Sequence, residues 1–579
     1  MYYFDMNGYL KDNPDSRLQY DALKFTASLQ GLLNRSGAVL YINFLEGSDE
    51  YWLTYIMEYG SLGIDEVVNI KDFNELVEIF KDRIKGVVLW DEAVPATANA
   101  AATICGVEGL VPIRYDESEG SLYSRLVKNG PQFPVGKNLA GMFTGRGLIP
   151  GTNRESCGSA KGDVYLWAKE HYLDKGLCNP KLMAYMADAY TWKEGTVCYG
   201  NMDNTLLANH DYYIANKAFF FDLSPWDDET PNDDRNQPLG TDLAVMKELL
   251  LSQYKQNGGR EITSVGGFTP WHVKYTDFNN NHCKHDGVPT EWKYGEILSA
   301  YNAIMDADAP NLCGMANASM FSRFRIDESL LKNERPPKRK LENKTYILYY
   351  MGDYDSAAWL SRMTPSIWND PARGMIPLMW PYNPNLSDRA PHVFDYVYRT
   401  RTKNDFFAAG DSGAGYLNPT FLLEPRVHSD LPSAMDVWVE HNLKYYNRFD
   451  LSITGFIING HKPITPEVQR AYALFSPDGV GHNGGGKGVP PMEAGTVFHP
   501  HTADIALLAK DTDEAAGIIY ANTQPGKPQF HIFRSILCTP SFMVQLTERI
   551  KREHPEHNYE VVDPYTFFDL LKQHLEMQS

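Results

Sequence analysis

The stretch of sequence that decides the fold class is residues 346–362, YILYYMGDYDSAAWLSR. Its first six residues, Tyr346 to Met351, are apolar or aromatic, which is typical of a buried strand. Gly352 and a short acidic loop follow, and Ala357 to Arg362 then has the composition of a helix. A buried strand, a polar loop and a helix in this order predict one unit of a parallel α/β sheet.

The same rhythm of strand, loop and helix recurs toward the C-terminus. Further strands are predicted over 375–380, 406–409, 451–458, 517–521, 530–533 and 559–562, and a last helix over 564–575. Units repeated in this way predict a larger α/β domain over residues 341–579, either barrel-like or doubly wound.

Upstream of the Pro336-Pro337 linker, strands and helices alternate in shorter groups. The chain has 579 residues, more than the roughly 250–300 that one hydrophobic core serves. We therefore expect a multidomain α/β protein with small βαβ-type N-terminal domains at 1–85, 86–158 and 159–335. In the third of these, helices are predicted over 181–188 and 241–256, and strands over 218–221 and 262–268.

Composition and charge narrow the classes of partner. Hydrophobic residues make up 43% of the chain and charged residues 22%, as in an ordinary folded protein. The formal net charge of −19 repels phosphate backbones and anionic lipid, so no nucleic acid or membrane-surface partner is expected. No apolar run approaches the ~20 residues that span a bilayer. Residues 1–7 lack the pattern of a signal peptide, so we expect either a cytoplasmic chain or a mature form without its leader.

Acidic residues follow two of the predicted strands. Asp353 and Asp355 are two residues apart, so in extended backbone their side chains point to the same side, and Asp411 follows the strand at 406–409. Carboxylates at strand ends can divide acid and base roles or hold a divalent cation. We predict Asp353, Asp355 and Asp411 as the catalytic residues, and the alternative for Asp355 is a helix N-cap.

A glycine-rich string, Gly413-Ala414-Gly415-Tyr416-Leu417-Asn418-Pro419, lies just beyond Asp411. Glycine allows positive φ and close approach of backbone to a ligand, and no lysine follows where a phosphate loop requires one. The string resembles the signature of the GxGYxYP family of putative glycoside hydrolases, with Asn418 in place of the second Tyr. Residues 353–356 are similar to the family's acidic Asp-Gly-Asp-Asn segment, with departures at Tyr354 and Ser356.

The resemblance covers most of the chain, including residues 270–275, 305–309 and 562–565. It implies consecutive N-terminal domains, a C-terminal domain that carries the motif, and a carbohydrate substrate. It also implies a secreted or periplasmic protein of Bacteroides-type bacteria. The departures at Tyr354, Ser356 and Asn418 leave open a shifted specificity or a lost activity. No cofactor is expected.

A tryptophan beside acids is typical of a sugar subsite, because the ring stacks on a sugar face and carboxylates bind hydroxyls. We expect the substrate-binding residues to lie in a cleft between domains. They are Gly413, Gly415, Tyr416, Asn418, Trp226, Asp227, Asp228, Trp271, His272, Lys274, Trp380, His461, His482 and Asn483.

Two alternatives to a two-carboxylate glycoside hydrolase remain open. A metal-assisted hydrolase, such as a carbohydrate deacetylase, would use Asp353 or Asp355 with His461, His499 or His501. A glycan-binding protein without catalysis would keep the aromatic and Asn/Asp residues without two converging carboxylates. The sequence indicates neither the glycan nor the oligomeric state.

Overall fold

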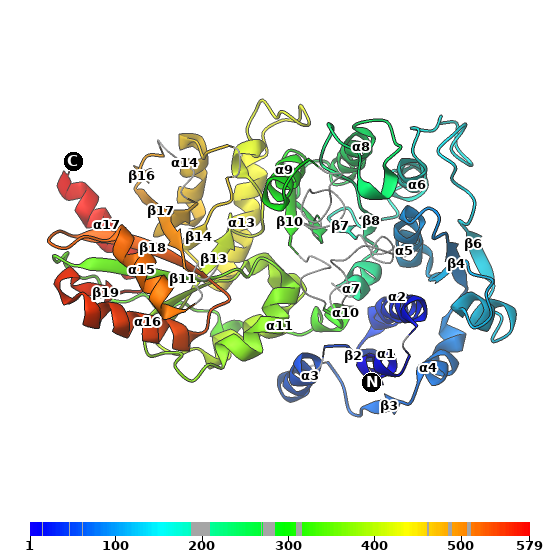
Figure 1. Cartoon of the computed structure of the whole chain (residues 1–579), viewed down its shortest axis with the longest axis horizontal. Coiled ribbons are helices and arrows are strands. Elements are labelled where there is room, and N and C mark those ends of the chain that lie inside the picture. The colour runs from blue at the N-terminus through cyan, green and yellow to red at the C-terminus, as the bar shows by residue number, and fades with distance from the viewer. Residues whose placement is uncertain are drawn as a thin grey trace. The chain divides into compact units, whose positions relative to one another are not determined.

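The computed structural model describes residues 1–13, 15–45, 47–60, 62–186, 209–267, 269, 284–307, 315–459, 462–483, 489–505 and 511–578. The chain divides into two compact units (Figure 1). The first contains Met1–Arg325, Arg389–His392 and Val427–Leu431. The second contains Ile326–Asp388, Val393–Arg426 and Pro432–Ser579, and each unit is described by itself.

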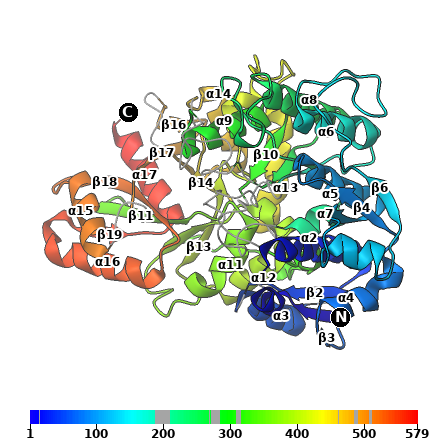
Figure 2. The same ribbon diagram turned by 45° about the vertical axis from the view of Figure 1, so that its right-hand side comes forward.

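The second unit is built on a closed parallel barrel (Figures 1 and 2). Its described strands are, in order around the barrel, β11 (Thr345–Gly352), β12 (Leu378–Pro381), β13 (Asp405–Asp411), β14 (Ile453–Phe456), β15 (Gly479–His482), β17 (Thr496–Asp504) and β18 (Gln529–Ile536). Strand β11 pairs in parallel with both β18 and β12, which closes the barrel. The predicted α/β class with a barrel-like C-terminal domain is confirmed.

Two further strands lie outside the closed ring. Strand β19 (Tyr559–Val561) pairs in parallel with the first residues of β11, and β16 (Met492–Glu493) pairs antiparallel with β17. The helices of this unit are α11 (Ala357–Trp368), α12 (Pro391–Thr400), α13 (Met435–Phe449), α14 (Pro466–Phe475), α15 (Thr512–Asn522), α16 (Pro540–Glu553) and α17 (Pro564–Gln578). Short 3-10 turns are η9 (Glu328–Leu330), η10 (Pro384–Asp388), η11 (Pro419–Leu422) and η12 (Pro555–His557).

Helix starts follow from capping residues. Thr465 and Thr539 each accept a hydrogen bond from a first-turn backbone N–H of α14 and α16, respectively. Helix α11 is capped by Ser356, which accepts from the backbone N–H of Trp359 at 3.2 Å. The alternative of an N-cap at Asp355 is therefore wrong, because Ser356 holds that position.

The predicted strand over 517–521 is wrong, since these residues lie in α15. The β-branched pair Ile518-Ile519 favours a strand, but Asp511 accepts hydrogen bonds from the backbone N–H groups of Asp513 and Glu514 and starts a helix. Burial of Ala515, Ala516 and Ile519 follows the helical period.

The described part of the first unit holds three small parallel sheets. The first has the order β2 (Leu40–Asn43), β1 (Tyr2–Asp5), β3 (Val68–Ile70), and the second has β5 (Val111–Arg114), β4 (Val87–Trp90), β6 (Val135–Asn138). The third has β10 (Ala303–Asp306), β9 (Thr263–Gly266), β7 (Leu182–Tyr185), β8 (Phe219–Phe221). These sheets fall one in each of the stretches 1–85, 86–158 and 159–335, whose boundaries stay predictions.

Helices of the first unit connect these strands (Figure 2). They are α1 (Met6–Asp12), α2 (Ser16–Leu33), α3 (Ser48–Tyr59), α4 (Phe73–Phe80), α5 (Ala96–Glu108), α6 (Ala160–Ala168), α7 (His210–Ala215), α8 (Thr241–Gln256), α9 (Gly287–Ser299) and α10 (Ala318–Phe321). In the described residues, no helix has the length and apolar character needed to cross a membrane.

The predicted helix over 181–188 is wrong in its described residues, because Leu182–Tyr185 is strand β7. This strand pairs on one side with β8 and on the other with β9, and all four of its residues are buried. A short strand buried on both faces has no alternation of polar residues to distinguish it from a buried helix. The predicted β8, α8 and β9 are confirmed.

Candidate active site at the carboxyl end of the barrel

The carboxyl ends of parallel barrel strands meet at one edge, where active sites of such folds lie. Polar residues stand at or close to all seven described strand ends of this barrel. They are Asp353 after β11, Asn383 after β12, Asp411 at the end of β13, Asn459 after β14, His482 and Asn483 at the end of β15, Asp504 at the end of β17, and Arg534 near the end of β18.

Tyr350 of β11 lies among these side chains. Its ring centroid is 5.0 Å from that of His501 and 6.1 Å from that of Phe456. An added Cβ at Gly352 or Gly455 would collide with this ring, so both glycines make room for it. The hydroxyl is buried and has no hydrogen-bond partner among the described residues. Burial raises the pKa of Tyr350 well above its usual value, and the charges of Asp411 and Asp353 raise it further.

Asp353 lies beside a charged pair. Arg534 donates two hydrogen bonds to Asp504, from Nε to Oδ1 and from Nη2 to Oδ2, each 2.9 Å long. Its Nη1 is 3.9 Å from Oδ1 of Asp353. Burial raises the pKa of the Asp353 carboxyl, the positive charge of Arg534 lowers it, and the negative charge of Asp504 raises it. The net effect is a raised pKa. A carboxyl with a raised pKa keeps its proton to higher pH, as a general acid requires.

His501 of β17 is neutral. Its Nε2 lies 2.8 Å from the carbonyl oxygen of Gly455, so Nε2 carries the hydrogen and Nδ1 is an acceptor. Removal from water lowers the pKa of His501 to about 3. The Nδ1 atom is buried and makes no hydrogen bond to the described residues. The ring therefore offers a hydrogen-bond acceptor to a ligand.

Three asparagine side chains also have unused hydrogen-bonding capacity, counted over the described residues. Asn459 is 1% exposed, and neither atom of its amide is hydrogen-bonded. Asn383, after β12, accepts from the backbone N–H of Asp411 at 2.9 Å, but its Nδ2 has no partner, and neither has Oδ1 of Asn483. Buried polar groups are normally paired, so several unsatisfied ones at one edge of a barrel indicate a binding site.

The glycine-rich loop after β13 is held rigidly. A Cβ at Gly413, where φ is +113°, would collide with Oδ1 of Asn442, which accepts from the backbone N–H of Ala414 at 2.8 Å. Gly415 also has positive φ, +119°, and Tyr416 is 2% exposed. Asn418 donates from Nδ2 to the carbonyl oxygen of Asn459 at 2.8 Å. The departure at Asn418 thus ties this loop to the end of β14.

Other predicted residues of this unit take different places. Trp380 is fully buried, donates from Nε1 to Asp405 at 2.9 Å, and packs against Trp368, so its ring serves the core. His482 is buried, and its Nδ1 lies 2.9 Å from the carbonyl oxygen of Asn483. Asp355 is half-buried. His461 lies outside the described residues.

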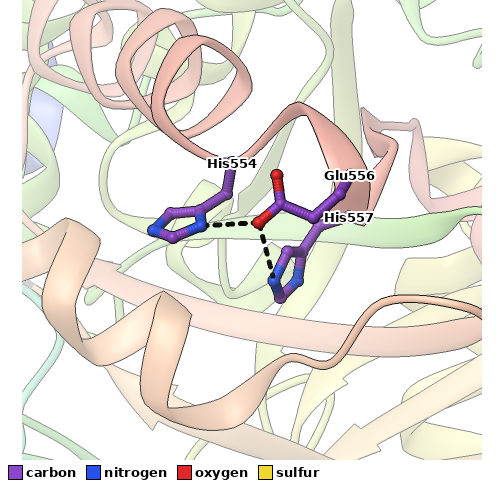
Figure 3. A group of neighbouring side chains, drawn as sticks. All are labelled: His554, Glu556 and His557. Atoms are coloured by element: carbon purple, nitrogen blue, oxygen red, sulfur yellow. Dashed lines mark hydrogen bonds and ion pairs between the residues drawn. The ribbon is translucent and has the colours of Figure 1, made fainter.

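The metal-dependent alternative relies on Asp and His at this edge. His499 and His501 both direct Nε2 at backbone carbonyls, of Phe530 at 3.1 Å and of Gly455 at 2.8 Å. The group of described residues with metal-ligand spacing is His554, Glu556 and His557, in the turn between α16 and β19 (Figure 3). Over the described residues, no group of three or more such side chains with this spacing forms at the carboxyl edge of the barrel.

In the first unit, the predicted Trp226, Asp227 and Asp228 lie on the loop after β8. His285 stacks on Trp226 with ring centroids 3.4 Å apart and its Nε2 2.8 Å from Oδ1 of Asp228. One face of the indole is therefore covered, while Asp227 and Asp228 are exposed. Trp271, His272 and Lys274 lie outside the described residues.

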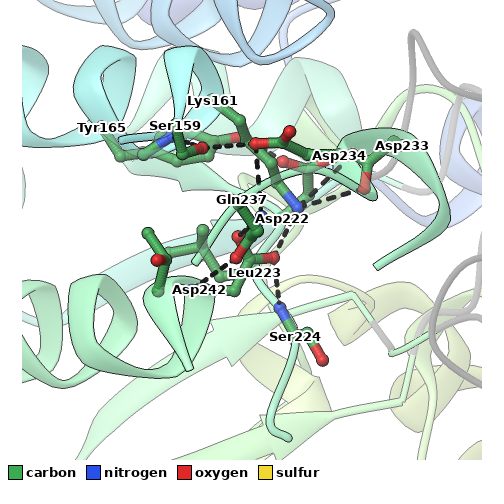
Figure 4. A network of polar contacts seen from close by, with 12 residues as sticks. Ser159, Lys161, Tyr165, Asp222, Leu223, Ser224, Asp233, Asp234, Gln237 and Asp242 are labelled. Carbon is green, nitrogen blue, oxygen red and sulfur yellow. Dashed lines mark hydrogen bonds and ion pairs between the residues drawn. The ribbon is translucent and has the colours of Figure 1, made fainter. Parts of the chain in front are cut away.

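A buried ionic network fixes this loop (Figure 4). Lys161 of α6 is 6% exposed, and its Nζ is 2.6 Å from Oδ2 of Asp242 in α8 and 3.4 Å from Asp233. Asp222, at the end of β8, accepts a hydrogen bond from the Tyr165 hydroxyl. Because the network joins the start of the loop to the helix that follows it, it positions the segment that carries Trp226.

These features define an α/β-barrel protein with an acidic, hydrogen-bonding site at the carboxyl edge of its barrel. The chain belongs to the GxGYxYP family. Residues 343–572 match its C-terminal domain, described as "GxGYxYP putative glycoside hydrolase C-terminal domain", and residues 15–82 match its first N-terminal domain. The family resemblance expected from the sequence is confirmed.

The fold is similar to that of a putative hydrolase from Bacteroides thetaiotaomicron VPI-5482, with a TM-score of 0.68 and 16% identity over 99% of this chain and 94% of that chain. At this identity the likeness shows the fold alone. A mutant of BA3943, a CE4 family pseudoenzyme with restored enzymatic activity, has a TM-score of 0.26 and 11% identity over 41% of this chain and 72% of that chain, which carries no argument. No curated protein is significantly similar to the sequence.

Proposed function

We propose that the protein is a glycoside hydrolase whose reaction takes place at the carboxyl edge of the barrel in the second unit. The observation that carries the proposal is the pair of acids at one edge of the barrel, Asp353 directly after β11 and Asp411 at the end of β13. The charges of both raise the pKa of the buried Tyr350 of β11. Two carboxyl groups that act on one buried position are the equipment of glycosidic bond hydrolysis. The family description supports the same reaction class.

Asp353 is proposed as the general acid. Its raised pKa favours the protonated form, from which it gives its proton to the glycosidic oxygen as the bond from that oxygen to C1 breaks. Asp411 then either bonds to C1 as a nucleophile or takes a proton from the water that attacks C1. Both routes consume one water molecule. The nucleophile route retains the configuration at C1 and the base route inverts it, so the anomer that is released first distinguishes the two routes.

The unsatisfied side chains suit a sugar ligand. A hydroxyl group both donates and accepts hydrogen bonds, so it can bind donors such as Nδ2 of Asn383 and acceptors such as Nδ1 of His501. Asn459 offers one of each. The glycine-rich loop beside these side chains is proposed to shape the binding site rather than to take part in the reaction. Its residues are Gly413, Gly415, Tyr416 and Asn418.

The first unit is proposed to contribute to glycan binding by itself. The indole of Trp226, which has Nζ of Lys293 6.0 Å from its centroid, and the exposed acids Asp227 and Asp228 suit stacking and hydroxyl contacts. We also propose a secreted or periplasmic location, as for the family resemblance described above.

The test is release of new reducing ends from a panel of oligosaccharides by the full-length protein and by Asp353→Asn and Asp411→Asn. Each variant should lose about 10²–10⁴-fold in kcat/KM, the usual contribution of one acid–base group. Asp436→Asn, an exposed acid in the first turn of α13, is the matched control and should keep full activity.

The outcomes separate the alternatives. Binding of an oligosaccharide without any new reducing ends would favour a glycan-binding protein. Release of acetate that stops when a chelator is added would favour the metal-assisted deacetylase. Full activity in Asp353→Asn would exclude the assignment of the acid.

A further inference from the structure

The turn between α16 and β19 brings three side chains with metal-binding atoms to one place. His554 ends α16, Glu556 and His557 lie in η12, and the three point toward one another in Figure 3. Nδ1 of His554 is 2.9 Å from Oε1 of Glu556, and Nε2 of His557 is 4.0 Å from the same oxygen. We propose that these residues bind a divalent transition-metal ion of the zinc class.

The distances suit such an ion. Zinc bonds to imidazole nitrogen at 2.0–2.1 Å and to carboxylate oxygen at about 2.0–2.2 Å, so two ligand atoms of a tetrahedral site are roughly 3.3 Å apart. The separations of 2.9 and 4.0 Å lie on either side of that value, and all three atoms lie within 4.8 Å of one another. Small side-chain rotations therefore complete three corners of a tetrahedron, with water at the fourth.

The state of His557 is the second observation. Its side chain is 10% exposed, yet its Nδ1 is buried and has no hydrogen-bond partner among the described residues. Its Nε2 is too far from Glu556 for a hydrogen bond. The imidazole is nine-tenths buried and makes no hydrogen bond to the described residues, so its Nε2 has no protein partner that would compete with a metal ion.

The position in the fold also favours a cation. His554 is the C-cap of the fourteen-residue helix α16, and its backbone N–H bonds to the carbonyl of Ile550. The C-terminal end of a helix carries partial negative charge from its unpaired carbonyls. Two imidazoles and one carboxylate select zinc, copper or nickel over magnesium and calcium, which require mainly oxygen ligands.

Metal binding at this turn would stabilise the neighbouring edge of the barrel. The carbonyl of His557 accepts a hydrogen bond of 2.9 Å from the Thr345 hydroxyl at the start of β11, and Tyr559 starts β19 two residues later. A metal held by His554, Glu556 and His557 would therefore fix the turn that leads from α16 into β19, beside the start of β11. Because the ligands are brought together by folding, bound metal stabilises the folded chain.

The test uses the full-length protein, freed of metal with a chelator and then titrated with ZnCl2 by calorimetry. His554→Gln and Glu556→Gln remove one ligand each, and each should weaken zinc binding by about tenfold or more. The matched controls are His574→Gln on α17 and Glu548→Gln on the exposed face of α16, and both should bind as the unchanged protein does. Zinc should also raise the Tm of the unchanged protein and of the controls, and raise it less in the two ligand variants.

A second measurement keeps the proposal falsifiable if a ligand variant folds poorly. Crystals of the unchanged protein soaked in zinc should show an anomalous peak between His554, Glu556 and His557. The proposal is overturned if the unchanged protein binds no zinc, if both ligand variants bind it with undiminished affinity, or if the peak lies elsewhere.

Discussion

At the scale of the residue, burial and Arg534 shift the pKa of the Asp353 carboxyl in opposite directions. Its guanidinium is held by Asp504 in two hydrogen bonds of 2.9 Å, which leaves Nη1 3.9 Å from the Asp353 carboxyl. Burial pushes the pKa of Asp353 up while Arg534 pushes it down. The proposed general acid is therefore poised by two opposing effects, and the net result is an upward shift.

Arg534→Gln should move the alkaline limb of the pH–rate profile to higher pH. A general acid works only while protonated, so the rate falls as pH rises through its pKa. Loss of the positive charge leaves burial and Asp504 to raise the pKa of Asp353 further. The measurement is kcat/KM against pH, with Arg470→Gln, an exposed arginine paired with Glu493, as control. A limb that moves to lower pH would contradict the assignment of Asp353 as the acid.

The sequence predicted the acids but not their neighbours. Asp353 and Asp411 could be found because charged residues that follow apolar runs mark strand ends. Tyr350 could not, since it lies inside such a run, and its position beside the site depends on room left by Gly352 and on Gly455, about a hundred residues away. His501 was considered as a metal ligand, but its hydrogen bond to Gly455 shows instead a neutral ring with a free acceptor.

At the scale of the element, the glycine-rich loop owes its shape to contacts with two helices and a strand end. Gly413 packs against Asn442 of α13, the carbonyl of Ala414 lies 2.7 Å from Nε2 of His441, and Asn418 reaches the end of β14. The Tyr472 hydroxyl of α14 donates to the carbonyl of Ser412 at 3.1 Å. The loop is therefore part of the rigid rim of the barrel.

Gly413→Ala should destabilise the protein by more than about 1 kcal/mol, because a residue with a Cβ is strained at positive φ and would collide with Asn442. Gly517→Ala is the matched control. Gly517 lies inside α15 with nothing within 4 Å of an added Cβ, so this change should stabilise by up to about 1 kcal/mol. Urea unfolding gives the free energy of unfolding of both variants. Equal changes in the two would contradict the claim that positive φ and the contact with Asn442 require glycine at position 413.

The buried network of the first unit makes a second prediction at this scale. Lys161→Met should destabilise by about 3–5 kcal/mol, because Asp242 and Asp233 would lose the charge that compensates their burial. Lys175→Met, at an exposed position, should change the free energy of unfolding by less than about 0.5 kcal/mol. A small effect of Lys161→Met in thermal or urea unfolding would mean that the network does not hold the loop.

Strands and helices were predicted correctly where a polar loop or a capping residue marks their ends in the sequence, and less well where no such residue does. Strand β11 stands out because an apolar run meets a polar loop. Strand β7 is short and buried, so periodicity could not separate strand from helix. The strand predicted over 517–521 followed from the β-branched pair Ile518-Ile519, although these residues lie in α15. Strands β15 and β17 were missed because they contain Gly479, Gly481 and Pro500, which are poor strand formers by composition. Their places are set by pairing with neighbours in the barrel.

At the scale of the whole molecule, charge restricts the substrate. The chain carries a formal net charge of −19, and besides the proposed acid Asp353 the described rim of the barrel presents Asp355, Asp411 and Asp504 against Arg534. We expect the proposed site, with this excess of carboxylates, to repel acidic sugars and to accept neutral or amino sugars.

Neutral oligosaccharides should therefore bind more tightly than otherwise matched oligosaccharides that contain uronic acid. Raising the salt concentration should narrow the difference, because salt screens the repulsion. Calorimetry at two salt concentrations measures both effects. Tighter binding of the acidic oligosaccharide at low salt would show that the charges of the rim do not govern selection.

The central claim is that Asp353 and Asp411 act on one glycosidic bond at the carboxyl edge of the barrel. The most direct measurement is a crystal structure of the Asp353→Asn variant soaked with an oligosaccharide that the unchanged protein cleaves. We predict that residue 353 lies within hydrogen-bond distance of the glycosidic oxygen and that the Asp411 carboxylate lies on the opposite side of C1. Sugar bound away from both residues, or a metal held by Asp and His in its place, would contradict the account.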